Sequence, residues 1–339
     1  MQDKVRVGMI GVGGIARLHM NQLLALPEVE IAAIADVNDA RIAAAREQFP
    51  QLASVKAFEQ YEDMLAEVEM DAVEISTPHT LHFEQAMAAL DRNLHVMVEK
   101  PMVCRVDHAK ELIRKSEEKE RVLMVAYQRH FQPQYRYIKK TVQEGGLGEV
   151  TFVAALQCQQ WKRGTTGTWR QDPALSGGGQ LNDSGSHLLD AILWTTDLAV
   201  SSVYAFIDNL GCEVDINSAV SIRFASGALG TVSIVGDAPC WYEDFTIWGT
   251  KGVIFYRNGK LVHCSEKGET TEPTDLPPAG GVDKGFIDCI LGRDVNWVPA
   301  TCGLRVIELT EAAWRSAKTG VPSAVTLSTE EHEAADKHG

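Results

Sequence analysis

Residues 5–16 read VRVGMIGVGGIA, and this stretch decides the fold of the first part of the chain. The six residues 5–10 form a short apolar run typical of a buried strand, and a helical run follows through Leu26. Between them, Gly11 permits a tight turn and Gly13 lets the backbone approach a pyrophosphate. Ala16 allows the helix to pack closely on the strand. The alternative is a tight turn in an α/β protein without a nucleotide, and this context fits it less well.

The strand before the turn and the helix after it predict a dinucleotide site at the start of that helix, where backbone N–H groups and the helix dipole favour phosphate. The residues expected to hold the phosphates are Gly11, Gly13, Gly14 and Ile15. Asp36 ends the next strand, 25 residues after Gly11, and its carboxylate can accept hydrogen bonds from ribose hydroxyls. Because that carboxylate would repel a 2′-phosphate, we expect NAD as the cofactor. Arg41 lies close by and can offset the charge, so NADP stays possible.

Strand-like and helix-like segments go on alternating to residue 127. After the first strand, further strands are expected at 30–36, 54–57, 72–76, 94–98 and 122–126, with helices at 40–48, 60–67, 79–90 and 106–119. Such alternation implies right-handed crossovers and a parallel sheet. The first domain, 1–127, is therefore predicted to be a doubly wound Rossmann domain of the α/β class.

The pattern changes after Tyr127, where a helix is expected at 135–143 and a long strand at 149–159. A loop rich in tryptophan and glycine follows, then a helix at 186–195. The remaining segments are expected as strands at 203–208, 219–224, 228–235, 245–248, 253–256 and 260–263, and helices at 281–291 and 303–317. Turn signals at 226–227 and 258–259 favour antiparallel pairing. We predict a second α/β domain over 128–327 with a mainly antiparallel open sheet, and a polar tail over 328–339.

The composition argues against several classes of function. The chain of 339 residues has 32 Lys and Arg against 46 Asp and Glu, a formal charge of −14, so nucleic-acid and membrane partners are not expected. The beginning of the sequence lacks an apolar signal segment, and no apolar run reaches transmembrane length. Seven scattered cysteines without a C-x-x-C pair argue against disulfides and structural zinc. We therefore expect a cytoplasmic protein, most simply an enzyme.

Two tripeptides lie at the ends of the fourth and fifth predicted strands, where ligands of an open parallel sheet bind. They are Ser76-Thr77-Pro78 and Glu99-Lys100-Pro101. Lys100 would lie at the rim of a buried strand, a position that suits proton exchange with a substrate hydroxyl. From position alone, a strand-end lysine extending into water is an equally good interpretation.

A second cluster of polar residues lies at 182–190, with Asp183 and His187 spaced i, i+4. If the helix has begun there, Asp183 can orient the His187 imidazole, which can take a hydroxyl proton. Two other interpretations stay open from these residues: a helix N-cap at Asp183 or Ser184, and a packed, hydrogen-bonded His187. No metal site is expected, since His79-x-x-His82 has no carboxylate or cysteine near it at ligand spacing.

Taken together, these motifs resemble the glucose–fructose oxidoreductase / inositol dehydrogenase (Gfo/Idh/MocA) family. The similarity runs from Val5 to about Thr326 and rests on GVGGIA (11–16), Asp36, STPHTLH (76–82), EKP (99–101), YQRHFQP (127–133), SGGG (176–179) and DSGSH (183–187). The resemblance implies hydride exchange between nicotinamide and a carbon of a sugar, inositol or related polyol. It also implies a homodimer or homotetramer that forms through the sheet of the second domain.

The resemblance also assigns roles to individual residues. Lys100 and His187 would be the acid/base pair with Asp183 beside His187, and the Lys100–Pro101 bond is expected to be cis. The cofactor side would include Asp36, Arg41, Ser76, Thr77, Pro78, His82 and Glu99. The substrate side would include Arg129, Trp161, Arg163, Trp169 and Arg170. The two arginines of the loop could instead pair with surface acids, and the tryptophans could simply pack.

Two other functions occur on proteins that resemble this family. One is a glycoside hydrolase that retains NAD and uses transient oxidation to drive elimination. The other is a ligand sensor without catalysis, which has no need of an acid/base pair such as Lys100 and His187.

Overall fold

The computed structural model describes residues 4–325, which divide into two compact units. The first unit comprises residues 1–103, 107–128 and 280–304, and the second comprises 104–106, 129–279 and 305–339, where the chain is described. Residues 280–304 thus return to the first unit, beyond the expected boundary at 127. The tail expected at 328–339 lies outside the described residues.

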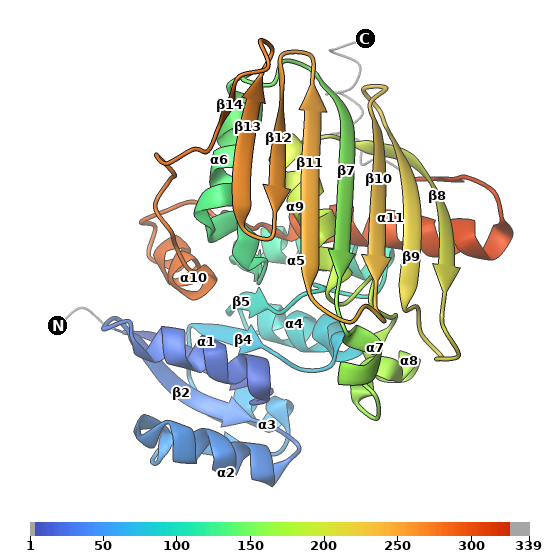
Figure 1. Ribbon diagram of the computed structural model, residues 1–339. Helices are drawn as coiled ribbons and strands as arrows, with labels where there is room; N and C mark the ends of the chain where they lie inside the picture. Colours follow the sequence, from blue (N-terminus) through green and yellow to red (C-terminus); the bar gives the residue numbers. More distant parts are fainter. Residues whose placement is uncertain (1–3, 326–339) are drawn as a thin grey trace. The chain divides into compact units, whose positions relative to one another are not determined.

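The first unit is built on a six-stranded parallel sheet in the order β3-β2-β1-β4-β5-β6 (Figure 1). Its strands are β1 (Val5–Ile10), β2 (Val29–Ala35), β3 (Lys56–Phe58), β4 (Ala72–Ile75), β5 (His95–Val98) and β6 (Leu123–Val125). The helices between them are α1 (Gly14–Leu24), α2 (Asp39–Gln48), η1 (Pro50–Leu52), α3 (Tyr61–Glu67), η2 (His79–Leu81), α4 (His82–Asp91) and α5 (Val106–Glu118). The strand order reverses between β1 and β4, which is where ligands of doubly wound sheets bind. The predicted Rossmann sheet is confirmed.

Local sequence explains the boundaries of these elements. The apolar side chains of β1 are buried on both faces, as expected for a central parallel strand. Helix α2 begins where the Asn38 side chain accepts a hydrogen bond from the Ala40 backbone N–H. Helix α10 (Val282–Ile290) comes from the far end of the sequence and packs against α1 within this unit.

The second unit contains a nine-stranded sheet in the order β14-β13-β12-β11-β7-β10-β9-β8-β15. The strands are β7 (Val150–Cys158), β8 (Val200–Asp208), β9 (Asn217–Phe224), β10 (Leu229–Val235), β11 (Tyr242–Gly249), β12 (Gly252–Arg257), β13 (Lys260–Ser265), β14 (Thr270–Thr271) and β15 (Ser323–Ala324). Every pair is antiparallel except β7 with β10, so the predicted mainly antiparallel sheet is confirmed. The turns at 226–227 and 258–259 close hairpins, and Asn258 and Gly259 both have positive φ.

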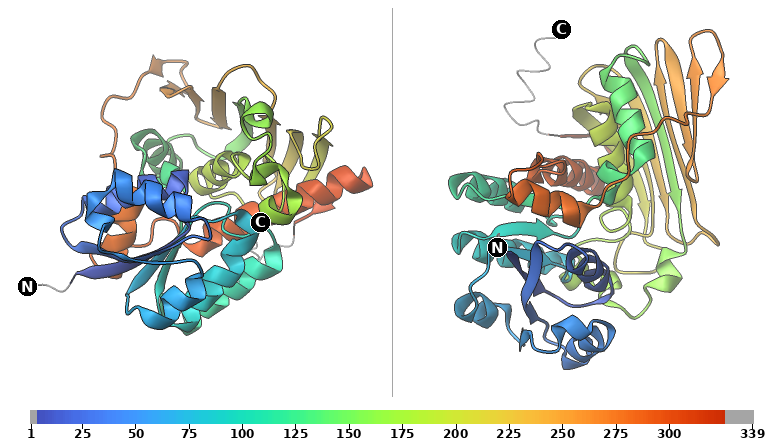
Figure 2. Two further views of the ribbon diagram at one scale, coloured as in Figure 1. Left: turned by 90° about the horizontal axis from the view of Figure 1, so that it is seen from below. Right: turned by 90° about the vertical axis from the view of Figure 1, so that its left-hand side faces the viewer.

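One face of this sheet carries helices, and the other face is open. The helices are η3 (Gln128–Phe131), α6 (Pro133–Gln143), α9 (Gly185–Thr196) and α11 (Ala300–Thr319). Figure 2 shows α6 and α9 on one side of the strands, whereas no described helix covers the opposite side. Within the described residues, no helix is long and apolar enough to cross a membrane.

The tryptophan-rich loop after β7 is more ordered than the sequence indicated. It contains α7 (Trp161–Gly164), η4 (Trp169–Gln171) and α8 (Pro173–Ser176). The Thr168 side chain caps η4, and the Asp172 side chain caps α8 ahead of Pro173. These caps are local signals that define the short helices.

Candidate active site

The glycine turn lies between β1 and α1 and leaves room for a ligand. Gly11 has a φ of +85°, and a Cβ there would lie 2.8 Å from the Ser76 carbonyl oxygen, so only glycine fits. Gly13 is the N-cap of α1, and a Cβ at Gly13 or Gly14 would meet no atom within 4 Å. The backbone N–H groups at the start of α1 can therefore be approached closely by an anion, as a pyrophosphate requires. These residues fit a dinucleotide.

Asp36 follows β2, and its buried carboxylate is tied to the glycine turn. Its Oδ2 accepts a hydrogen bond from the Val12 N–H at 2.9 Å, and its Oδ1 accepts one from the Asn38 N–H at 2.9 Å. The partly exposed Arg41 places Nη1 3.6 Å from Oδ2. The carboxylate is thus held at the strand end where an adenosine ribose would lie, with a cation beside it as expected.

The two predicted tripeptides follow neighbouring strands, because β4 and β5 pair in parallel through Ile75 and Val98. The Ser76 hydroxyl donates to Glu74, and the Thr77 hydroxyl donates to Gln85. On the other turn, the Lys100–Pro101 peptide bond is cis, which confirms the expectation from resemblance.

His82 connects these two turns through the backbone. Its Nε2 lies 3.0 Å from the Thr77 carbonyl oxygen, and its Nδ1 lies 2.9 Å from the Pro101 carbonyl oxygen. Burial lowers the pKa of the His82 imidazole, although both carbonyl contacts act in the opposite direction. The ring therefore fixes the spacing of the turns that carry Thr77 and Lys100.

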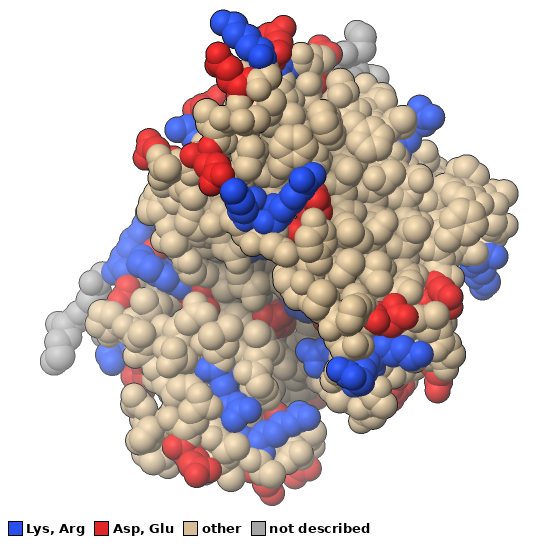
Figure 3. Space-filling model, in the orientation of Figure 1, with Lys and Arg blue, Asp and Glu red and all other residues tan. Residues whose placement is uncertain are grey.

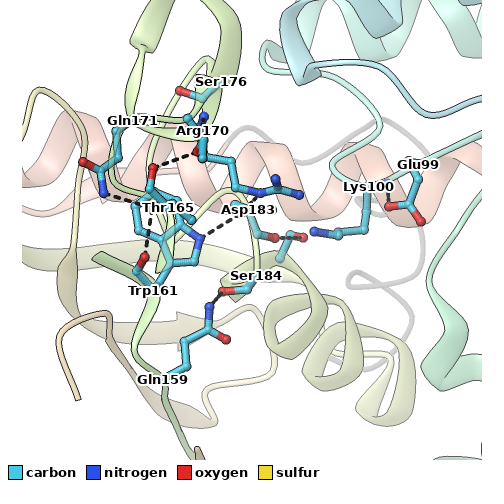
Figure 4. Close-up of polar contacts among 12 residues, drawn as sticks. Glu99, Lys100, Gln159, Trp161, Thr165, Arg170, Gln171, Ser176, Asp183 and Ser184 are labelled. Carbon is cyan, nitrogen blue, oxygen red and sulfur yellow. Dashed lines mark hydrogen bonds and ion pairs between the residues drawn. The ribbon is translucent and has the colours of Figure 1, made fainter. Parts of the chain in front are cut away.

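In the second unit, Asp183 lies two residues before α9 begins, so the condition for a shared helix face with His187, a helix that has begun by Asp183, is not met. Its Oδ2 accepts hydrogen bonds from Trp161 Nε1 at 2.8 Å and from Arg170 Nε at 3.1 Å (Figure 4). Figure 4 shows both donor side chains pointing toward this carboxylate. The N-cap position of α9 belongs to Ser184, whose hydroxyl accepts from Gln157 and Gln159 and does not cap the helix. The structure thus brings the loop and the Asp183 segment together.

The predicted loop residues differ in their surroundings. Trp161 is buried against Val214 and Ile216, so it packs as well as donating to Asp183. The Arg170 guanidinium lies over the Trp169 ring, with its Cζ 4.5 Å from the ring centroid. Arg163 is exposed on α7.

Arg129 contacts protein groups that the sequence did not indicate. Its guanidinium forms a buried ion pair with Glu243 on β11, and Nη1 donates to the His187 carbonyl oxygen at 3.2 Å. Tyr135 donates its hydroxyl to the same Glu243 carboxylate at 2.6 Å, and burial raises the pKa of that tyrosine far above its usual value. Arg129 therefore anchors the first turn of α9, which carries His187.

A second group missed by the sequence analysis lies inside the first unit. It consists of His19 on α1, Glu74 on β4 and Asp283 on α10, together with the predicted Glu99. Residues 19, 99 and 283 are too far apart in sequence for spacing to indicate contact. A glutamate inside the apolar strand of residues 72–75 was the only local sign.

Comparison with known proteins identifies the family to which the chain belongs. Residues 5–127 match the profile of an oxidoreductase family with an NAD-binding Rossmann fold, and residues 135–255 match the GFO/IDH/MocA C-terminal domain. The chain belongs to the Gfo/Idh/MocA family of oxidoreductases. Its first unit is accordingly an NAD-binding Rossmann domain.

Individual relatives agree with this assignment. The chain is 26% identical to myo-inositol 2-dehydrogenase of Thermotoga maritima over 282 residues, which cover 78% of this chain and 80% of that protein. It is 31% identical to D-xylose 1-dehydrogenase (NADP(+)) 2 of Haloferax volcanii over 236 residues, covering 68% and 70%. A solved structure of levoglucosan dehydrogenase in complex with NADH superimposes with a TM-score of 0.86 at 22% identity, covering 96% of this chain and 100% of that one.

Proposed function

We propose that this oxidoreductase transfers a hydride between NAD and a CH–OH carbon of a sugar, inositol or related polyol, with Lys100 and His187 as the acid/base pair. One observation carries the proposal: the turn with Lys100 follows β5, the neighbour of β4, on the same sheet edge as the glycine turn and Asp36. Relatives named for inositol, xylose and levoglucosan support a polyol substrate.

The proposed reaction needs a hydride acceptor and a group that accepts or returns a proton. When bound, NAD⁺ supplies the hydride acceptor. The substrate hydroxyl, on losing hydride from its carbon, must also lose its O–H proton, and the Lys100 amine or the His187 imidazole would accept it. In reduction the same group returns the proton to the carbonyl oxygen. Fixing the hydroxyl between two such side chains would also orient the reacting carbon.

We propose that Asp183 acts on the substrate side of this pair. Its carboxylate is held by Trp161 and Arg170 from the loop after β7, so substrate binding and the position of Asp183 would be linked through that loop. Arg163 and Trp169 would contact the substrate from the same loop, where an arginine suits a carboxylate or phosphate on a sugar acid. Arg129 would act through the backbone of His187.

The first experiment measures absorbance at 340 nm with purified protein, NAD or NADP, and a panel of sugars, inositols and sugar acids. The same samples are denatured to detect cofactor that copurifies. Growth of NADH with one polyol is the expected result. Silence across the panel with NAD retained would favour a glycosidase that uses transient oxidation, and silence without retained cofactor would favour a ligand sensor.

Replacement of Lys100 tests the acid/base role. Lys100→Met removes the amine and keeps most of the volume, so kcat is expected to fall by about 10²–10⁴-fold, the usual contribution of general acid–base catalysis. NAD affinity, measured by fluorescence titration, should stay within a few-fold. Lys115→Met is the matched control, because Lys115 on α5 pairs with Asp91 at the end of α4, outside the proposed site. Unchanged turnover in Lys100→Met would remove this residue from the chemistry.

We further propose that the protein is a homodimer or homotetramer that assembles through the open face of the nine-stranded sheet. Leu229 on β10, Phe152 on β7 and Trp248 on β11 are register partners, so their side chains share one face. Leu229 is 42% exposed and Trp248 is 44% exposed. Figure 3 shows few charged side chains over these strands. An apolar sheet face of this kind supports association with a second copy.

A further inference from the structure

Four titratable side chains from four separate segments meet inside the first unit. His19 comes from α1, Glu74 from β4, Glu99 from the turn after β5 and Asp283 from α10. None of the four residues is more than 5% exposed. Burying so many ionisable groups without mutual compensation would cost several kcal/mol for each ion. We therefore ask whether these four side chains act on the turn that carries Lys100.

Both ring nitrogens of His19 face carboxylate oxygens. Nδ1 lies 2.9 Å from Asp283 Oδ1, and Nε2 lies 3.1 Å from Glu99 Oε1. A neutral imidazole has one N–H and could donate to only one of these carboxylates. Burial alone would lower the pKa of His19, but the nearby Glu74, Asp283 and Glu99 outweigh it and raise this pKa well above its usual value. The geometry and the charges thus agree on a ring protonated at both nitrogens.

Glu74 lies farther from the imidazole than the other two carboxyl groups do. Burial raises the pKa of the Glu74 carboxyl to about 8, although His19 and the Ser76 hydroxyl act in the opposite direction. Its Oε1 accepts from Ser76 and lies 3.9 Å from His19 Nε2, too far for a hydrogen bond. The two carboxylates that contact the imidazole directly are therefore Glu99 and Asp283.

Glu99 links this cluster to the turn that carries Lys100. One oxygen of its carboxylate faces His19, and the other, Oε2, accepts the backbone N–H of Lys100 at 3.0 Å. Burial opposes ionisation of Glu99, but the hydrogen bond and charge of His19, followed by the charge and N–H of Lys100, hold its pKa below the usual range. Asp283 in turn fixes the imidazole from α10.

We propose that His19 is a positioning residue: its imidazole holds the Glu99 carboxylate against the backbone of Lys100 and so fixes the turn that presents the lysine. The inference rests on the proposed role of Lys100 in catalysis. In this arrangement the contact from α10 aligns the imidazole, the imidazole aligns the carboxylate, and the carboxylate aligns the turn. His82 restrains the same turn through the Pro101 carbonyl oxygen.

The first arm of the test needs no turnover. The full chain with NAD added is labelled with ¹⁵N-histidine and ¹⁵N-lysine and titrated by NMR. His19 is expected to remain protonated at both nitrogens at pH values well above 6.5, and Glu99→Gln should bring its titration down toward that value. The Lys100 amide resonance should move in His19→Gln and stay in place in His108→Gln. His108 is the matched control, since it stacks on Phe83 away from the cluster.

The second arm uses the substrate found with the panel. His19→Gln is expected to lower kcat at least tenfold and to change the pH profile of kcat, with the KM for substrate within threefold. Because His19 acts through Glu99, the double variant His19→Gln/Glu99→Gln should be no slower than the slower single variant. A purely structural role would instead lower stability without changing the pH profile of the remaining activity.

The outcomes separate this inference from the proposed function. The inference that His19 is a positioning residue is overturned if His19 titrates near 6.5 in the unmodified protein or if the Lys100 amide does not respond to His19→Gln. It is also overturned if kcat of His19→Gln stays within twofold of that of the unmodified protein. If no substrate is turned over, the proposed function fails, while the NMR arm still decides whether His19 and Glu99 hold Lys100. If His19→Gln does not fold, the unmodified protein and Glu99→Gln carry the same titration.

Discussion

At the scale of single residues, Asp36 combines two tasks in one carboxylate. It accepts N–H groups from Val12 and Asn38, and it stands where the cofactor ribose is expected. Only one of these features could be anticipated: the strand-end position of Asp36 follows from the sequence, whereas its hydrogen bond to the glycine turn depends on the folded backbone. A substitution here is therefore expected to act on cofactor choice and on the turn together.

Asp36→Ala should shift preference from NAD toward NADP, because it removes the charge that repels a 2′-phosphate and leaves Arg41 beside the site. Charged hydrogen bonds contribute about 1.5–3 kcal/mol, so KM for NAD should rise at least tenfold. The ratio of kcat/KM values for NADP and NAD measures the shift. Asp39→Ala is the control, since it removes the same charge from an exposed position at the start of α2. An unchanged ratio in Asp36→Ala would mean that this carboxylate is not at the ribose.

A substitution at Gly13 tests cofactor binding separately from the stability of the fold. Its φ of −69° is open to any residue, and an added Cβ would meet no protein atom within 4 Å. Gly13→Ala should therefore change the free energy of unfolding by less than about 1 kcal/mol. The methyl group would nevertheless obstruct a pyrophosphate lying on the turn, so the Kd for NAD should rise at least tenfold in a fluorescence titration. Wild-type affinity in this variant would place the phosphates elsewhere.

At the scale of elements, the sequence predicted most strands and helices because their signals are local. Runs of apolar residues located β1, and the Asn258-Gly259 turn located the hairpin of β12 and β13. What the sequence did not predict depends on contacts across the chain. The parallel pairing of β7 with β10 and the return of residues 280–304 to the first unit leave no local trace. The buried partners of His19 and Arg129 were missed for the same reason.

The pair formed by Arg129 and Glu243 ties β11 to the first turn of α9. Removing one partner leaves an uncompensated buried charge, so Glu243→Gln is expected to lower the free energy of unfolding by about 3–5 kcal/mol, as measured by urea denaturation. Arg129→Met should cost a similar amount, and the double variant Arg129→Met/Glu243→Gln should cost less than the two together. Arg257→Met is the control, because it breaks the more exposed pair with Asp244 on the same sheet. Additive effects at Arg129 and Glu243 would contradict the coupling.

At the scale of the whole molecule, the open sheet face is the feature that most favours association of copies of the chain. Large exposed apolar patches on folded proteins mark interaction surfaces, and this face carries Phe206, Leu229 and Trp248 with exposed fractions of 66%, 42% and 44%. The family resemblance implied assembly through this sheet, whereas the face itself follows from the structure, in which β8, β10 and β11 alternate buried and exposed residues with apolar side chains among the exposed ones.

Introducing charge on this face should separate the copies. Trp248→Asp combined with Leu229→Lys places two ions where an apolar interface would close, so sedimentation equilibrium at micromolar concentration should change from dimer or tetramer to monomer. The control combines Val37→Asp with Val321→Lys, two exposed apolar positions that lie outside the strands of this sheet. Thermal unfolding of the dissociated variant should depend less on protein concentration than that of the unmodified chain. A monomeric mass for the unmodified protein would contradict the proposed assembly, and an unchanged oligomer in the charged variant would move the interface to another surface.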